Sequence, residues 1–232
     1  MSLSLARRAV VVGAALAVGL TGSVGFRAVP AGAQQVRVDA AKRLAAAAIT
    51  RRVLALRELE TGAKAIARLS AADRSALSTL LQSQIDGLTS LNAKIQGDGD
   101  EATVRADAGK IITDYRVYVL TIPEARSVVV SDIELTAGDR LSKLADRLQT
   151  TIDGATSKDT TKAKADLASM RAKLVAATGN VSPLPAQLLA LQPAGYPGNR
   201  TTLEQARTAL RTGRAGLADA AVLARQVIAD LK

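Results

Sequence analysis

Apolar side chains recur every three or four residues along most of the chain, which is the spacing that places them on one face of an α-helix. The longest repeats span residues 38–68, 70–96, 100–120, 123–152 and 202–232, and a shorter one spans residues 163–177. Steps of three and four alternate within them, as in helices that pack through heptad seams. The pattern predicts an all-α fold, an elongated antiparallel bundle of about five long helices and one short helix with coiled-coil-like packing.

Polar residues interrupt the predicted seams of the first two helices. Arg52 lies in the first seam, where the neighbouring Val53 is the alternative inward residue. Gln84 lies in the second seam. We expect these positions to be the weak points of the two apolar stripes, because a buried polar group needs a hydrogen-bond partner.

Two short polar segments indicate helix starts. Ser70 followed by Asp73 is typical of an N-terminal cap, since the hydroxyl accepts a backbone N–H and the acid faces the positive helix end. Gly97–Glu101 offers three carboxylates, which suggests either a calcium loop or a turn that caps the next helix. A calcium loop needs ligands further along, where Thr103 and Arg105 stand, so the turn is the preferred interpretation.

The segment Ile111–Pro123 has the densest run of β-branched and aromatic residues. Helical spacing relates four of its members, which are Ile111, Tyr115, Tyr118 and Ile122. Read as a strand, the segment has no polar face, so we predict helix rather than strand. Pro123 either kinks one long helix or lies in the first turn of a new helix, for which Thr121 is the candidate cap.

The C-terminal third contains the clearest helix breakers. Gly179–Asn180 predicts the end of a helix, and a proline-rich connector follows at residues 181–199, in which only residues 184–191 could coil. Tyr196 is expected to pin this connector onto the bundle. Thr202 with Gln205 forms a capping-box pattern for the last helix.

One sequence element occurs twice. Residues Leu81–Ser90 resemble residues Leu148–Ser157, and a turn and a further helix follow each copy. The similarity predicts two related helical hairpins, although one short match also arises by chance in sequence of low complexity.

The N-terminus has the organisation of an export signal. Arg7 and Arg8 precede the apolar stretch Ala9–Gly25, and Ala31–Ala33 is a small-residue cleavage site. An uncleaved membrane anchor is the alternative, which the shortness of the apolar stretch disfavours. We therefore expect residues 1–33 to be a signal peptide and residues 34–232 to be one secreted, extracellular or cell-wall-associated domain that does not span the membrane.

The chain has no His and no Cys, and its two Met and three Tyr are scattered. Serine, cysteine and imidazole-based catalysis therefore lack their usual residues. A hydrolase would have to rely on carboxylates or a metal, and the acids lie on faces predicted to be solvated. The sequence predicts no catalytic, cofactor-binding or metal-binding residue.

The charge balance favours anionic partners. The net charge of +10 falls to +7 if residues 1–33 are removed, and a basic exported protein attracts anionic envelope polymers. Arg207, Arg211 and Arg214 form one stripe of the last helix and are a candidate contact for such polymers, with a plain solvated face as the alternative. Specific nucleic-acid binding is not expected, because aromatic residues for stacking are scarce.

A second candidate surface lies in the Ile111–Pro123 segment. Tyr115, Arg116 and Tyr118 are residue types enriched at interface hot spots. The alternative is core packing of the two tyrosines.

Three stretches are similar to a family of secreted helical proteins from high-GC Gram-positive bacteria. They are GLTSLNAKIQGDGDEATVRAD at residues 87–107, DYRVYVLTIPEAR at residues 114–126 and SPLPAQLLALQPAGYPGN at residues 182–199. The resemblance covers most of the chain after residue 33. It implies export and bacterial origin, and it assigns no activity and no site residue.

The sequence thus predicts a non-enzymatic exported helical protein that acts as an envelope-associated structural or interaction module. A holdase-like chaperone or carrier for exported clients is the alternative, and it requires an exposed apolar groove. A carboxylate- or metal-dependent hydrolase is the third hypothesis. The partner is expected to be an anionic polymer or another exported protein, and self-association stays open because heptad seams also pair between chains.

Overall fold

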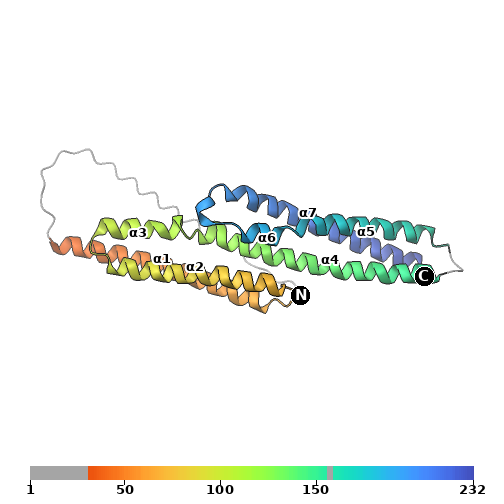
Figure 1. The fold of residues 1–232 in the computed structure, drawn as a ribbon, viewed down its shortest axis with the longest axis horizontal. Helices are drawn as coiled ribbons and strands as arrows, with labels where there is room; N and C mark the ends of the chain where they lie inside the picture. Colours follow the sequence, from red (N-terminus) through yellow and green to blue (C-terminus); the bar gives the residue numbers. More distant parts are fainter. Residues whose placement is uncertain (1–30, 156–158) are drawn as a thin grey trace.

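A computed structural model describes residues 31–155 and 159–232, and within these ranges every regular element is a helix. The helices are α1 (Ala31–Ala65), α2 (Ala71–Gly97), α3 (Glu101–Thr113), the π-helix η1 (Val117–Thr121), α4 (Ile122–Gly154), α5 (Thr161–Val181), α6 (Leu184–Leu189), the 3-10 helix η2 (Pro193–Gly195) and α7 (Asn199–Asp230). The predicted all-α, elongated bundle is confirmed (Figure 1).

The long helices form two groups that overlap near the middle of the molecule (Figure 1). Helices α1, α2 and α3 pack together at one end, and α4, α5 and α7 pack together at the other. One apolar core joins the first group to the start of α4, to the end of α5, to α6 and to the start of α7, and a second core lies among the remaining parts of α4, α5 and α7. The described helices include none that is long and apolar enough to cross a membrane.

The predicted apolar seams of the first two helices are largely confirmed, and each differs from the prediction at its one polar position. Arg52 and Val53 share the intermediate position, both half-buried, and Leu56 below them is fully buried. On α2 the buried residue is Ile85, and Gln84 beside it is only half-buried. Ile85 takes the core position in α2, whereas the side-chain oxygen of Gln84 is buried without a hydrogen-bond partner, which is a cost that an apolar residue does not have.

The predicted caps of α2 and α3 are confirmed. The Ser70 hydroxyl accepts the backbone N–H of Asp73 at 3.0 Å. Asp100 accepts the backbone N–H of Thr103 at 2.9 Å and its hydroxyl at 2.6 Å. These hydrogen bonds lower the pKa of the Asp100 carboxyl, because they stabilise its charged form. The Gly97–Glu101 segment is therefore a capping turn.

The prediction of one helix over residues 100–120 is wrong. Helix α3 ends at Thr113, and Arg116 adopts a left-handed backbone conformation with φ 45°, which interrupts the helical hydrogen bonds. The chain then forms η1 and continues without a gap into α4, with Pro123 in its first turn. Thr121 is itself helical and does not cap, since its hydroxyl donates to the carbonyl of Tyr115 at 3.4 Å.

The C-terminal boundaries also differ from the prediction. Helix α5 continues through Gly179 and Asn180 to Val181, and α7 begins at Asn199, so Thr202 lies inside the helix and caps nothing. The predicted inward residues of α5 and α7 are confirmed as buried, apart from the half-buried Leu231. The buried members are Ala163, Leu167, Met170, Leu174, Ala177, Leu203, Ala206, Leu210, Gly213, Leu217, Ala220, Ala224 and Val227.

The repeated sequence element does not occupy equivalent places. Leu81–Ser90 lies within α2, where Gly87 meets the Tyr115 ring, whereas Leu148–Gly154 forms the end of α4 and Gly154 faces open space. An ideal Cβ on Gly87 would lie 2.6 Å from the Tyr115 ring, so a larger residue there would require the ring to move. The end of the second copy, residues 156–157, and residues 1–30 of the predicted signal peptide lie outside the described ranges.

Candidate functional site

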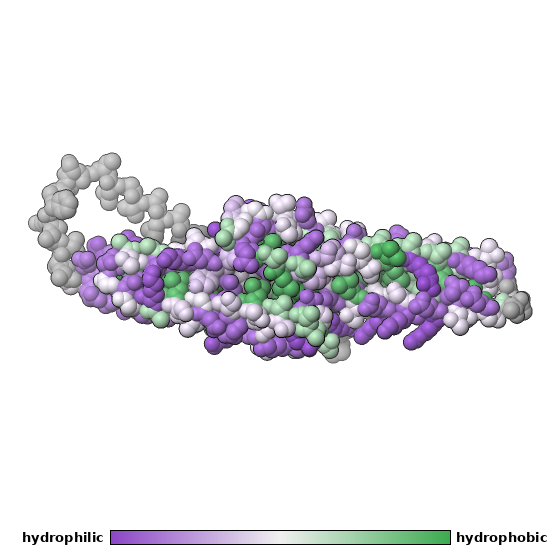
Figure 2. All heavy atoms as spheres, viewed as in Figure 1, coloured by the Kyte–Doolittle hydropathy of each residue, from purple (hydrophilic) through white to green (hydrophobic). Residues whose placement is uncertain are grey.

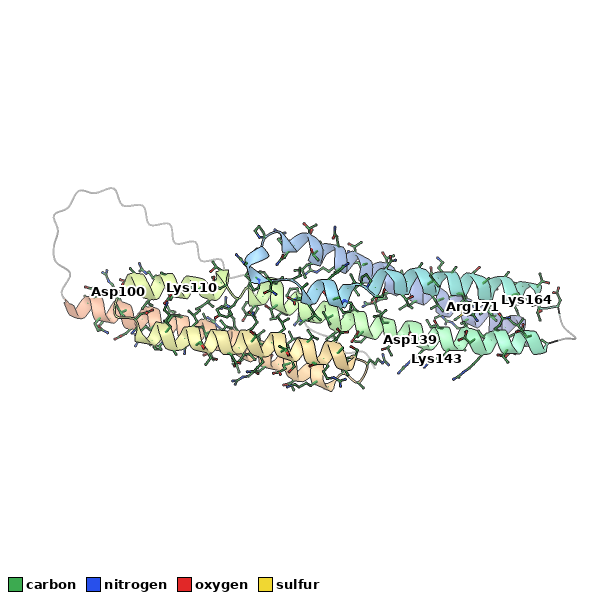
Figure 3. All side chains as sticks on the ribbon, viewed as in Figure 1. Asp100, Lys110, Asp139, Lys143, Lys164 and Arg171 are labelled. Carbon is green, nitrogen blue, oxygen red and sulfur yellow. The ribbon has the colours of Figure 1, made fainter. Side chains whose placement is uncertain are left out.

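An apolar groove lies between α1 and α3 and has a volume of about 530 Å³. Helices α1 and α3 run in the same direction, each antiparallel to α2, and Figure 3 labels Asp100 and Lys110 at the two ends of α3. Small and branched side chains form the groove floor. They are Ala41, Ala45, Ala48, Val104, Ala108 and Ile111.

Two large apolar side chains stand exposed on the walls of this groove. Leu44 of α1 is 72% exposed and Ile112 of α3 is 61% exposed. A neighbouring groove of about 500 Å³ between α1 and α4 includes none of the large exposed apolar residues. Figure 2 shows apolar residues gathered in patches along one face of the molecule, between hydrophilic side chains. The α1–α3 groove thus combines an apolar floor with two large exposed apolar side chains.

The polar residues of the groove are mostly cationic. Arg37 and Arg105 are exposed, and Arg105 forms an ion pair with Glu101 one turn away. Arg52, at the other end of the groove, donates from Nη1 to the carbonyl of Ala48 at 3.0 Å. Its guanidinium lies 5.1 Å from the ring centre of Tyr118. Burial lowers the pKa of Arg52, because it disfavours the charged form.

The predicted set of Tyr115, Arg116 and Tyr118 is not brought together as one surface. Tyr115 is half-buried against Gly87, and burial raises the pKa of its hydroxyl. Tyr118 is 50% exposed and is stacked by Arg52. The left-handed turn at Arg116 separates the two rings, so each meets a different part of the molecule.

Arg116 contacts the proline-rich connector. Its Nε donates to the carbonyl of Pro193 at 3.1 Å, and its guanidinium lies 4.5 Å from the ring centre of Tyr196. The expectation that Tyr196 pins the connector onto the bundle is confirmed. Arg116 therefore joins α3 and η1 to the segment that leads into α7.

The predicted arginine stripe lines a third groove, of about 480 Å³, between α4 and α7. Arg214 donates to Glu134 of α4 at 3.1 Å, while Arg207 and Arg211 form no ion pair with any residue that the structure describes. Leu210 and Val130 complete the groove. The structure thus brings the three arginines together around one shallow cationic groove.

Four buried carboxylates were missed by the sequence reasoning. Asp107 of α3 is held by Lys94 and Lys110, whose hydrogen bonds lower its pKa. On α4, Glu124 is 1% exposed and burial raises its pKa to about 8. Asp132 and Glu134 are also buried, and burial raises the pKa of both.

The partners of the α4 carboxylates differ. Asp132 accepts the backbone N–H of Ser70 at 2.6 Å and so ties the start of α2 to α4. Glu134 pairs with Arg214, and this ion pair partly offsets the effect of burial on its pKa. Glu124 has a side-chain oxygen that forms no hydrogen bond.

The carboxylates that have partners tie helices together, whereas the unpartnered oxygen of Glu124 is a cost to stability. None of the four lines any of the three grooves described above. Across residues 31–155 and 159–232, no group of acidic residues is arranged to hold a metal ion. A sequence signal exists for Glu124. Glu124, Ser127 and Ser131 share the helical face of Val128, so a mixture of polar and apolar residues on one face of α4 marks a buried polar stripe.

Comparison with known protein families, with curated proteins and with solved structures finds no match to this chain.

Proposed function

We propose that this chain is a non-catalytic exported protein that binds another macromolecule of the cell envelope through the α1–α3 groove. The observation that carries the proposal is the exposure of Leu44 and Ile112 on the walls of an apolar groove. Exposed apolar area costs about 25 cal/mol per Å² relative to burial. Large apolar patches on soluble proteins generally mark binding surfaces.

The groove favours a binding role over a purely structural rod. A rod needs only buried seams, and the carrier hypothesis requires an open apolar groove, which α1 and α3 provide. The buried carboxylates line none of the three grooves, so they are poorly placed to act on a substrate bound there. Binding without chemistry is therefore the function that the geometry supports best.

A second, weaker role is attachment to anionic envelope polymers through the groove of Arg207, Arg211 and Arg214. The specific observation in its favour is that two of these arginines have no acidic partner among the described residues. Such attachment is electrostatic and is screened by salt over about 8–10 Å at physiological ionic strength.

Capture from envelope fractions tests the proposal. The chain beginning at Gln34 is immobilised and incubated with cell-wall and membrane fractions, at low and at high salt. We compare the wild type with the double variant Leu44→Asp/Ile112→Asp, and use Val175→Asp as the control. Val175 is a matched control because it is 72% exposed on α5, far from the groove.

We expect a salt-resistant bound component that the wild type and Val175→Asp retain and the double variant loses. If all three proteins bound equally and lost the binding at high salt, the interaction would be non-specific charge attraction, and the proposed function would be wrong. Retention by the double variant at high salt would also contradict it, because the groove would then not be the binding surface.

A further inference from the structure

We infer that the α1–α3 groove receives an acidic amphipathic helix of a partner protein, which completes a four-helix arrangement with α1, α2 and α3. This inference rests on the proposed function, in which the groove is the binding surface, and it names the class of partner. The shape of the groove, its lack of free backbone hydrogen-bonding groups and its charge all favour such a helix.

The shape of the groove fits a helix. Both walls are helix faces, and the lining residues on each recur at helical spacing, from Arg37 to Arg52 on α1 and from Glu101 to Ile112 on α3. On α1 this corresponds to a length of about 22 Å at 1.5 Å per residue. The alanines of the floor lower the groove between the two helices, so that a ridge of side chains from another helix can approach closely.

The hydrogen-bonding character of the groove excludes an extended peptide. Helical walls offer no free backbone edge, because their N–H and C=O groups are already paired within each helix. An extended peptide in this apolar trough would lose water from unpaired backbone groups, at a cost of about 1–3 kcal/mol each. A helix brings its own backbone hydrogen bonds and presents only side chains, as in helix-in-groove recognition.

The charge of the groove selects an acidic helix. Among the described residues that line the groove, Arg37, Arg52 and Arg105 are cationic and Glu101 alone is acidic. Glu101 forms an ion pair with Arg105, so the uncompensated positive charge of the groove comes from Arg37 and Arg52. Arg52 is held in place by Tyr118 and by the carbonyl of Ala48, so little side-chain entropy is lost when it binds a carboxylate.

The same charge disfavours a second copy of this chain as the occupant. An isologous contact through this groove would bring the arginines of one α1 against those of the other. Like charges brought together at an interface weaken it. A partner helix with glutamates or aspartates beside its apolar face is instead attracted electrostatically to the same arginines.

Peptide binding tests this inference. The probe is a synthetic, fluorescently labelled peptide of about 16 residues, with leucines at helical spacing on one face and glutamates flanking them. The matched control peptide has lysine in place of every glutamate. Binding to the chain beginning at Gln34 is measured by fluorescence anisotropy, and peptide helicity by circular dichroism.

We expect the acidic peptide to bind and to gain helicity, and the lysine peptide to bind at least ~10-fold more weakly. Leu44→Asp/Ile112→Asp should lose the binding, and Val175→Asp should keep it. Arg37→Glu/Arg105→Glu should reverse the preference between the two peptides. This charge-reversal variant keeps the test informative even if the aspartate variants perturb folding, since Arg37 and Arg105 are both exposed.

Three results would overturn the inference. The first is equal binding of both peptides, or binding of neither. The second is Leu44-dependent binding of sodium dodecanoate together with no binding of the acidic peptide, which would indicate an acyl ligand. The third is a wild-type dimer in sedimentation that Leu44→Asp/Ile112→Asp dissociates, which would place a second copy in the groove.

The two proposals fail in different ways. Leu44-dependent capture from envelope fractions without binding of the acidic peptide would leave the proposed function standing and remove only the partner class. Loss of that capture in salt would remove the proposed function itself, whatever the peptide does.

Discussion

Glu124 has the lowest exposure among the buried acids of the described chain, at 1%. One of its carboxylate oxygens forms no hydrogen bond, and burial raises its pKa from 4.5 to about 8. A buried carboxyl of this kind is neutral in the folded protein over most of the physiological range and charged in the unfolded chain. The side chain therefore couples folding to pH.

The sign of this coupling follows from proton uptake. Between pH 4.5 and about 8 the folded state holds a proton on Glu124 that the unfolded state releases, so the stability from this group falls as pH rises. The slope is about 1.4 kcal/mol per pH unit. Glu124→Gln removes the titration while keeping the shape of the side chain.

We expect Glu124→Gln to match the wild type near pH 4.5 and to become progressively more stable than it up to pH 8, with a constant difference above that pH. Urea unfolding of both proteins across this range measures the difference directly, since all other groups titrate in both. A difference that does not change with pH would show that Glu124 is ionised in the folded state.

At the scale of the helix, the absence of a side chain at Gly213 lets α7 approach α5 and α4 closely. Gly213 is buried, and an ideal Cβ there would lie 2.5 Å from Val181 Cγ2 and 3.1 Å from Glu134 Oε2. Gly109 of α3 is the matched control, because nothing lies within 4 Å of its added Cβ.

We expect Gly213→Ala to lower the free energy of unfolding by about 1–3 kcal/mol, since the added methyl group must displace packed atoms. Gly109→Ala should raise it by about 0.5–1 kcal/mol through better helix propensity. Chemical denaturation of both variants checks the pair. Equal stabilisation by the two substitutions would mean that α7 moves away from α5 at little cost.

Periodicity predicted most helices because apolar residues at helical spacing have few alternatives to burial along a rod. It predicted the buried stripes of α5 and α7. Polar cap signals, which are local in sequence, predicted the helix starts at Ser70 and at the Gly97–Glu101 turn. It missed the break before Val117, because the left-handed conformation at Arg116 belongs to a residue with no preference for it. Arg116 contacts Pro193 and Tyr196, which are distant from it in sequence, so no local pattern indicates the turn.

The candidate site was less predictable than the fold. Leu44 and Ile112 are apolar residues at helical spacing, and periodicity alone does not tell whether such a residue is covered by another helix. The arginine stripe of α7 was predicted, because charge at regular spacing on a helix needs no tertiary information. The ion pair between Arg214 and Glu134 joins residues 80 positions apart and has no local signal.

At the scale of the whole molecule, three helices contribute residues to both apolar cores. Helix α4 contributes Val128 to the first core and Leu148 to the second, and α7 contributes Leu203 to the first and Val227 to the second. Helix α5 contributes its last residue, Val181, to the first core and Leu167 to the second. Loss of packing at one end of a continuous helix also destabilises its other end, because the backbone hydrogen bonds of a helix form cooperatively. The stability of the end formed by α1, α2 and α3, which carries the groove, is thus coupled to the stability of the end formed by α4, α5 and α7 (Figure 1).

This continuity predicts a single unfolding unit. Met170 of α5 is fully buried in the second core, and Met170→Ala should lower the free energy of unfolding by about 2–5 kcal/mol. We expect one thermal transition, shifted downward, and faster hydrogen exchange in α2 as well as in α5, although α2 has no residue in the second core. Val175→Ala, at an exposed position of the same helix, should change stability by less than about 0.5 kcal/mol. If the slowest-exchanging amides of α2 kept their protection while those of α5 lost theirs, the two cores would unfold independently, and binding at the α1–α3 groove would be insulated from the rest of the rod.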